Sequence, residues 1–204
     1  MDKRLRRLEF HKTSLIDMEY CRKTAVSVPL IEKSGEYEVL FEVRAKNIEQ
    51  PGDVCFPGGG LEGDETPREA AIREAAEELL INPSQLKIIG LMDVIYNPSG
   101  MLIYPFAAEL KDYEGSFSKD EVDEVFTVPL SFFLENEPEV YIVKAKVIPG
   151  DDFPYELIYG GEDYDWRPRK EVIYFYRYGE RVIWGLTAKI IRSFAKIYKA
   201  EVLE

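Results

Sequence analysis

The chain has 204 residues, 46% hydrophobic and 31% charged, the composition of one globular domain able to bury a core. It carries 26 Lys and Arg against 38 Asp and Glu, a net charge of −12. Because nucleic-acid phosphates and anionic membranes reward clustered Lys and Arg, this balance argues against nucleic acid and membrane surfaces as partners. A single histidine, His11, and two isolated cysteines, Cys21 and Cys55, exclude sites with several His ligands and Cys-x-x-Cys metal sites.

No targeting segment is evident. No apolar run approaches the ~18 residues of a membrane span. The basic residues 1–7 are not followed by an apolar signal core. Cysteines without a pairing motif are typical of a reducing compartment. We therefore expect a cytoplasmic protein.

The first half of the chain has well-marked element boundaries. Residues 1–12 are expected to form a short basic helix, and the extended segments 25–31 and 37–43 form a hairpin around Ser34-Gly35. The glycine-rich segment 56–60 is predicted to be a loop leading into a helix. Thr66 as N-cap, Pro67 as first helical residue and Glu69 as partner in a capping box mark the start of that helix. Asn82-Pro83 predicts its end near Ile81.

The second half is predominantly extended. Further strands are expected at 86–96, 101–110, 122–128, 140–148, 172–178 and 181–184, and a final helix at about 187–200. Residues 149–170 are rich in Gly, Asp, Tyr and Pro and are expected to be an elaborated surface loop. Strands flanked by a few helices indicate one α+β domain over residues 1–204, built on a mixed sheet.

The predicted helix after the glycines carries three acids at helical spacing. Glu74, Glu77 and Glu78 fall on one side, almost opposite Ile72, Ala75, Ala76 and Leu79. Side chains at these spacings lie within about 5–6 Å, so the carboxylates repel one another. A divalent cation would relieve that repulsion, and Mg²⁺ prefers carboxylate oxygens. The alternative is an ordinary solvated acidic face.

The preceding Gly58-Gly59-Gly60 run lets the backbone approach a ligand closely. Alone it is weak evidence, because such a run is more often a turn. Joined to the acidic helix at fixed spacing it becomes specific. The stretch Gly59-x5-Glu65-x7-Arg73-Glu74-Ala75-x-Glu77-Glu78-x-Leu80-Ile81 resembles the Nudix box, the signature of the Nudix hydrolases. Leu80 departs from the pattern, which has a glycine there to ease the helix exit.

The resemblance implies a fold, a cofactor and a reaction. The Nudix fold is an α/β/α sandwich around a mixed β-sheet. In that fold Glu74, Glu77 and Glu78 bind Mg²⁺ or Mn²⁺ together with a backbone carbonyl of Gly59 or a neighbour. Arg73 and Glu65 would form a structural ion pair. The reaction is attack by water on a diphosphate that joins a nucleoside to another group, with bound cations neutralising the diphosphate and lowering the pKa of a bound water.

The general base is left open by the resemblance. It is one of the helix glutamates or an acid of the segment 120–124, for which Glu121 is our candidate. The alternative for Glu121 is a solvated acidic turn.

The wider chain, from about Leu40 to Ala188, resembles the coenzyme A pyrophosphatase branch of the family. The matching positions are Leu40, Arg44, Ala45, Gly52, Phe56-Pro57-Gly58-Gly59, Asp93, Ser99-Gly100, Pro105, 121–126, 128–130, 178–180 and 183–185. This implies cleavage of coenzyme A or acyl-CoA to 3′,5′-ADP and (acyl-)phosphopantetheine, with Arg44, Gly58 and Gly59 binding substrate. Glu49 stands where the branch has a second arginine. An exposed strand arginine is the alternative for Arg44.

The sequence is also compatible with other functions. The diphosphate could belong to ADP-ribose, a dinucleotide or an oxidised nucleoside triphosphate, or the domain could be a non-catalytic nucleotide sensor. The aromatic residues Tyr155, Tyr159, Tyr164 and Trp166 would stack on a base or cover the core. A homodimer is expected only by analogy, through the N-terminal segment or this aromatic loop.

Overall fold

The structure is a computed structural model that describes residues 6, 10, 11, 15–97 and 99–200. The helix expected over residues 1–12 lies outside these residues, apart from three single positions. The strands are β1 (Arg22–Lys33), β2 (Glu36–Arg44), β3 (Val54–Cys55), β4 (Gly58–Gly60), β5 (Leu86–Leu91), β6 (Ile95–Asn97), β7 (Met101–Leu110), β8 (Val122–Pro129), β9 (Glu139–Ala145), β10 (Arg169–Tyr178) and β11 (Arg181–Trp184). The α-helices are α1 (Pro67–Glu78), α2 (Leu130–Glu135) and α3 (Gly185–Lys199), and short 3-10 helices span Met18–Tyr20, Pro83–Gln85, Tyr155–Leu157 and Gly161–Asp163.

The main sheet is mixed, as expected. Its strand order is β3-β2-β1-β7-β5, with β4 paired to β1, β6 to β7 and β8 to β2. The long pairing of β1 with β7 is parallel, whereas β1 runs antiparallel to both β2 and β4. The predicted hairpin is confirmed: Ser34 (φ 54°) and Gly35 (φ 86°) both take left-handed conformations, which match the twist of two-residue hairpin turns.

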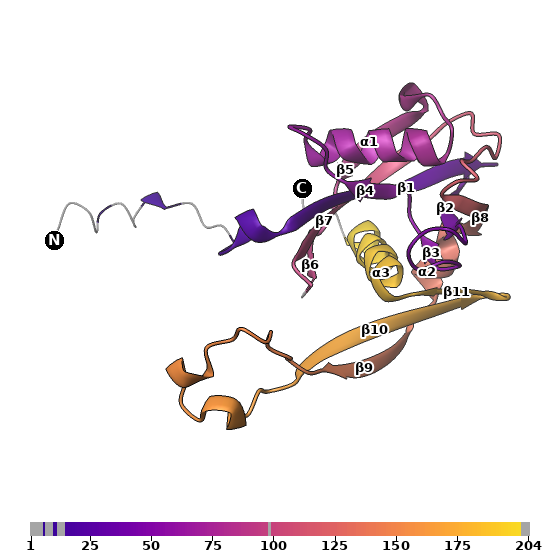
Figure 1. The fold of residues 1–204 in the computed structure, drawn as a ribbon. Coiled ribbons are helices and arrows are strands. Elements are labelled where there is room, and N and C mark those ends of the chain that lie inside the picture. The colour runs from indigo at the N-terminus through magenta and orange to yellow at the C-terminus, as the bar shows by residue number, and fades with distance from the viewer. Residues whose placement is uncertain (1–5, 7–9, 12–14, 98, 201–204) are drawn as a thin grey trace.

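Helices cover both faces of this sheet (Figure 1). Val39 and Phe41 of β2 pack in one core with Ile190 and Phe194 of α3, whereas Leu40 packs in another with residues of α1. This alternation along β2 follows from the two-residue period of a strand. The α/β/α sandwich expected from the sequence is therefore present.

A second, three-stranded sheet has the order β11-β10-β9. Strands β9 and β10 extend beyond the main body as an arm, at whose tip lie the two 3-10 helices of the 149–170 loop (Figure 1). There the rings of Phe153 and Trp166, and of Tyr164 and Trp166, contact each other edge to face. Tyr159 is 98% exposed. The aromatic loop therefore does not cover the core.

Several predicted elements differ from those in the structure. The strand expected over 86–96 is broken into β5 and β6, because its partner β7 carries Pro105, which has no N–H to continue the ladder. The glycine segment, expected to be a loop, forms β4, since its backbone pairs with residues 24–26 of β1. The strand expected over 140–148 ends at Ala145, where its pairing with Arg169, the first residue of β10, ends.

Helix α1 begins as predicted. The Thr66 N–H donates to Glu69 Oε2 at 2.8 Å, and the Glu69 N–H donates back to Thr66 Oγ1 at 3.3 Å. This capping box satisfies two backbone donors that the first helical turn would leave unpaired.

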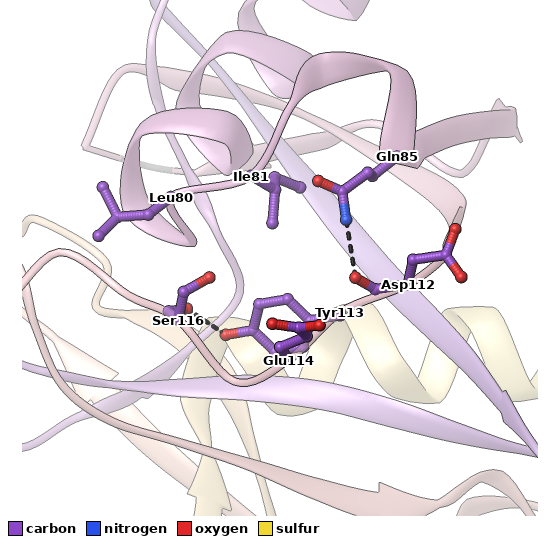
Figure 2. Close-up of a pocket in the computed structure, with 7 residues that line it drawn as sticks. All are labelled: Leu80, Ile81, Gln85, Asp112, Tyr113, Glu114 and Ser116. Atoms are coloured by element: carbon purple, nitrogen blue, oxygen red, sulfur yellow. Dashed lines mark hydrogen bonds between the residues drawn. The ribbon is translucent and has the colours of Figure 1, made fainter.

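The helix ends at Glu78, earlier than the sequence predicts. Leu80 takes a left-handed φ of 51°, the conformation that a glycine would adopt without steric cost. The hydroxyl of Ser116 donates to the carbonyl of Leu79 at 2.7 Å and so caps the helix end. In a small pocket there, of about 230 Å³, Ile81 points toward Tyr113 while Leu80 points away (Figure 2). None of the expected catalytic residues lines this pocket.

In the described part of the chain, no helix is long and apolar enough to cross a bilayer.

Candidate active site

Strand β4 brings its glycines into direct contact with two of the predicted metal ligands on α1. The N–H of Gly58 donates to Glu78 Oε2 at 2.7 Å. A Cβ at Gly59 would stand 2.4 Å from Glu74 Oε1, so only glycine leaves room for that carboxylate. Gly58 itself has a φ of 156° and lies against the backbone of Ala25, where a Cβ would be 2.3 Å from the carbonyl oxygen. Both positions therefore require glycine, because a side chain there would collide with the Ala25 backbone or with the Glu74 carboxylate.

Arg73 braces this arrangement. Its guanidinium donates to both carboxylate oxygens of Glu65, at 2.8 and 3.2 Å, which confirms the predicted ion pair. It also donates to the Gly60 carbonyl at 3.0 Å and so ties β4 to α1. The same group donates to Glu74 at 3.0 Å and Glu77 at 3.1 Å. A planar fork of five donors suits such bidentate contacts better than a lysine would.

The three helix glutamates, which the helical wheel placed together on one side of α1, differ widely in exposure. Glu78 is buried, with 7% of its surface exposed, because the last turn of α1 packs against β4. The side chain of Glu77 is 59% exposed and engaged by Arg73. Glu74 lies between these extremes. A helical wheel assigns buried contacts only to the apolar side of the helix. It therefore does not predict that the glycine strand β4 packs against the acidic side.

Glu121 lies in the turn before β8 and is held beside the same site. Its carbonyl accepts from the Ala45 N–H at 2.9 Å, and the N–H of Ser118 donates to the Glu78 carbonyl at 2.7 Å. The turn is thereby fixed between the end of β2 and the end of α1. The charge of Glu121 contributes to the rise in the pKa of Glu74 and of Glu78.

A fifth acid, Glu42 of β2, was not expected from the sequence. Its side chain is 1% exposed, and its Oε1 has no hydrogen-bond partner among the residues that the structure describes. The signal was a single charged residue in the otherwise apolar run from Val39 to Val43. By its pattern alone, that run indicates only a strand of the hairpin.

The carboxylates repel one another within this site. Burial raises the pKa of Glu78 to about 8; the Gly58 N–H opposes the rise and the charges of Glu74 and Glu121 add to it. Burial, followed by the charges of Glu78 and Glu121, also raises the pKa of Glu42 well above its ordinary value. Burial likewise raises the pKa of Glu74, against the lowering effect of Arg73. Such shifted pKa values cluster at functional sites.

The residues fit a divalent cation by their chemistry. All the side-chain donors are carboxylate oxygens, which suit hard cations, and the buried Oε1 of Glu42 lacks a partner that a cation would supply. Within the described ranges, no three His, Cys, Asp or Glu side chains already form a metal-binding group. Arg73 contributes to this lack of a ready-formed group, because it engages the carboxylate oxygens of Glu74 and Glu77.

A cavity of about 850 Å³ borders the glycine strand. Its wall combines β4 with β1, β7, the β2–β3 connection and the first turn of α3. The volume is within the 300–1,000 Å³ range of small-molecule sites. Gly58, Gly59 and Gly60 line it, so the strand that touches Glu74 and Glu78 also borders the cavity.

Polar and aromatic groups line this cavity. Arg44 is there, and its Nε donates to the backbone carbonyl of Glu49 at 2.7 Å. Glu49 also lines the cavity. Arg22 is a lining residue that the sequence did not single out. Trp184, one of the matching positions named in the sequence, also lines the cavity and stacks on Phe175 with ring centroids 5.7 Å apart. The aromatic residues 155, 159, 164 and 166 are not among the lining residues.

Comparison with known proteins defines the family. The NUDIX domain model matches residues 22–151, more than half of the chain. The chain therefore belongs to the Nudix family, whose hydrolases generally use divalent metal ions.

Individual relatives agree with this assignment. The chain is 36% identical over 134 residues to the peroxisomal coenzyme A diphosphatase NUDT7 of Mus musculus, an alignment that covers 64% of this chain and 56% of the relative. It is 29% identical over 177 residues to the mitochondrial coenzyme A diphosphatase NUDT8 of Homo sapiens, covering 84% of this chain and 66% of the relative. The crystal structure of a MutT/nudix family protein from Enterococcus faecalis has the same fold, with a TM-score of 0.53, 16% identity, and coverage of 100% of this chain and 72% of that one.

Proposed function

We propose that the protein is a divalent-metal-dependent diphosphatase that cleaves coenzyme A or acyl-CoA to 3′,5′-ADP and (acyl-)phosphopantetheine. One observation carries the proposal: the glycines of β4 line a ligand-sized cavity, and two of them also contact the carboxylates of Glu74 and Glu78. A diphosphate in this cavity can reach the edge of β4. There the acids would place cations against its oxygens.

We assign the following roles to the residues of the site. Glu74, Glu77, Glu78 and a carbonyl of β4, at Gly59 or beside it, would hold Mg²⁺ or Mn²⁺. A bound cation supplies charge neutralisation of the diphosphate and a lower pKa for a bound water. Glu121 would accept the proton from the attacking water, because its turn is fixed beside Glu78 through Ser118. Arg44, with Gly58 and Gly59, would bind the substrate.

The substrate assignment rests on two kinds of support. The sequence resemblance to the coenzyme A pyrophosphatase branch runs from about Leu40 to Ala188, and the mouse and human relatives are named as coenzyme A diphosphatases. Trp184 gives the cavity an indole that could stack on an adenine. Glu49 would weaken the coenzyme A assignment only if its carboxylate, rather than its backbone carbonyl, faced the substrate phosphates and repelled them.

The test is a panel of diphosphates incubated with the enzyme and Mg²⁺ or Mn²⁺, followed by mass spectrometry of the products. Release of phosphopantetheine supports the proposal. Turnover of ADP-ribose, a dinucleotide or an oxidised nucleoside triphosphate alone would replace coenzyme A by that substrate. Binding without any cleavage would favour a nucleotide sensor. The panel run with each metal separately shows which cation the enzyme uses.

Glu78→Gln tests the catalytic role of Glu78 in a protein that keeps its fold. The amide oxygen can still accept from the Gly58 N–H, so the fold should be retained while turnover falls by orders of magnitude. A matched control is Glu69→Gln, which changes an acid at the opposite end of α1, in the capping box. Near-normal turnover in Glu78→Gln would contradict the role of Glu78.

We further propose that two copies pair through β9, rather than through the tip of the aromatic loop. Every residue of β9 is exposed, including Val140, Tyr141 and Ile142, and β9 is the edge strand of its sheet. Such an apolar edge invites strand pairing. The strand begins with Glu139 and ends near Lys144, so antiparallel pairing of two copies sets opposite charges against each other.

A cytoplasmic location stays a prediction of the sequence.

A further inference from the structure

Glu42 occupies an unusual place for a carboxylate. It lies inside β2, paired with Cys55 of β3 on one side and Val125 of β8 on the other. Phe41, beside it in the chain, is fully buried in the core. Moving a carboxyl group from water into such surroundings costs several kcal/mol unless a partner compensates it.

No protein group within the described residues provides that compensation. Oε1 of Glu42 has no hydrogen-bond partner, and no ion pair to Glu42 is present. The nearest cationic side chain is Arg44, two residues along the same strand face, but its Nε is used on the carbonyl of Glu49. The unpaired oxygen is therefore not explained by the fold alone.

The side chain points toward the acids of the active site. Residues 40, 42 and 44 share one face of β2, and Leu40 packs in the core beneath α1. Glu42 therefore faces the side on which Glu78 ends the helix. The charges of Glu78 and Glu121 both raise the pKa of Glu42, so carboxylates from three separate elements lie within electrostatic reach of one another.

We propose that Glu42 supplies a carboxylate ligand from the floor of the sheet to the divalent cation held by the glutamates of α1. The inference rests on the proposed metal dependence, and it adds a ligand from β2 that the Nudix-box spacing does not contain. A cation would meet the unpaired oxygen and offset the repulsion among Glu42, Glu78 and Glu121. The site would thus have its donors on a rigid strand as well as on the helix.

The test is Mn²⁺ binding to the metal-free protein, measured by electron paramagnetic resonance of free Mn²⁺ and by the shift in melting temperature that Mn²⁺ produces. Glu42→Gln keeps the shape but removes the charge. We expect it to weaken Mn²⁺ binding by about tenfold or more, as loss of a ligand or its close support does. Without metal it should unfold at the same or a higher temperature, because a buried unpaired charge has been removed. Unchanged Mn²⁺ affinity would overturn the inference.

Glu38→Gln is the matched control. Glu38 is on the same face of the same strand but is hydrogen-bonded to Lys33 and Thr127, away from the site. Its Mn²⁺ affinity should equal that of the unmodified protein. If Glu42→Gln does not fold, Glu42→Asp retains the charge on a shorter side chain: weaker Mn²⁺ binding supports the inference and equal binding overturns it.

The outcomes separate the two proposals. Normal Mn²⁺ affinity in Glu42→Gln, with phosphopantetheine still released by the unmodified enzyme, overturns only the role of Glu42. Reduced affinity in that variant, with no diphosphate cleaved by the unmodified protein, supports the role of Glu42 and overturns the proposed function.

Discussion

Gly59 and Glu74 are so close that a methyl group on Gly59 would stand 2.4 Å from the Glu74 carboxylate. The two residues are fifteen positions apart in the chain, and the pairing of β4 with β1 beneath α1 brings them together. A side chain at 59 would therefore act on the proposed metal site rather than on the core.

Gly59→Ala tests this contact. Gly59 does not need a positive φ, so alanine fits its backbone, and the far end of the Glu74 side chain must move instead. We expect a loss of turnover of at least about 100-fold, in line with the effect of a misplaced catalytic group, with a small change in melting temperature. Gly90→Ala is the control, since nothing lies within 4 Å of a Cβ there. Equal activity in both variants would contradict the role of the contact.

Leu80→Gly should stabilise the protein. A left-handed conformation costs a non-glycine residue roughly 1–2 kcal/mol, and glycine loses about 0.5–1 kcal/mol of that gain through backbone entropy. Leu80 is 59% exposed, so little packing is lost. The expected net gain is up to about 1 kcal/mol in the free energy of urea unfolding, with turnover unchanged. A clear loss of stability would show that the Leu80 side chain has a packing role.

The metal-free protein should lose stability as pH rises. Burial raises the pKa of Glu78 from 4.5 to about 8 in the folded state. Between these values the folded protein holds a proton that the unfolded chain has released. The contribution is therefore complete below about 4.5 and is lost as pH rises through about 8.

Urea unfolding in the presence of a chelator measures this dependence. We expect the free energy of unfolding to fall by roughly 1–3 kcal/mol between mildly acidic and mildly alkaline solution. In Glu78→Gln the slope should be smaller, because the titrating group is gone. An equal slope in both proteins would assign the effect to other groups.

Ile142→Lys tests the proposed dimer. Ile142 is 64% exposed on β9, so the fold should tolerate the change, while two copies would bring like charges together. We expect a shift from dimer to monomer in sedimentation velocity, with an unchanged melting temperature at low concentration. Leu157→Lys, at the exposed loop tip, is the control. A monomer before mutation would refute the pairing.

Local signals in the sequence predicted the parts of the fold that local chemistry decides. The capping box of Thr66 and Glu69, the Ser34-Gly35 hairpin and the ion pair of Arg73 with Glu65 were all found where expected. Each depends on residues close together in the chain or on a motif of fixed spacing.

Features set by long-range pairing could not be predicted. The glycine strand forms because β1 offers an edge to it, and that contact buries Glu78. The cavity combines Arg22, Arg44 and Trp184, which are far apart in the sequence. The sequence left open whether the aromatic loop stacks on a base or covers the core, because composition does not show that β9 and β10 carry it away from the main sheet (Figure 1).

Anomalous diffraction from crystals soaked in Mn²⁺ tests the metal site most directly. We predict a peak between β4 and the last turn of α1, with oxygens of Glu74, Glu77 and Glu78 and a backbone carbonyl of β4 as ligands, joined by a carboxylate oxygen of Glu42 from β2. Manganese bound elsewhere, with these carboxylates still held only by Arg73 and Gly58, would contradict the account.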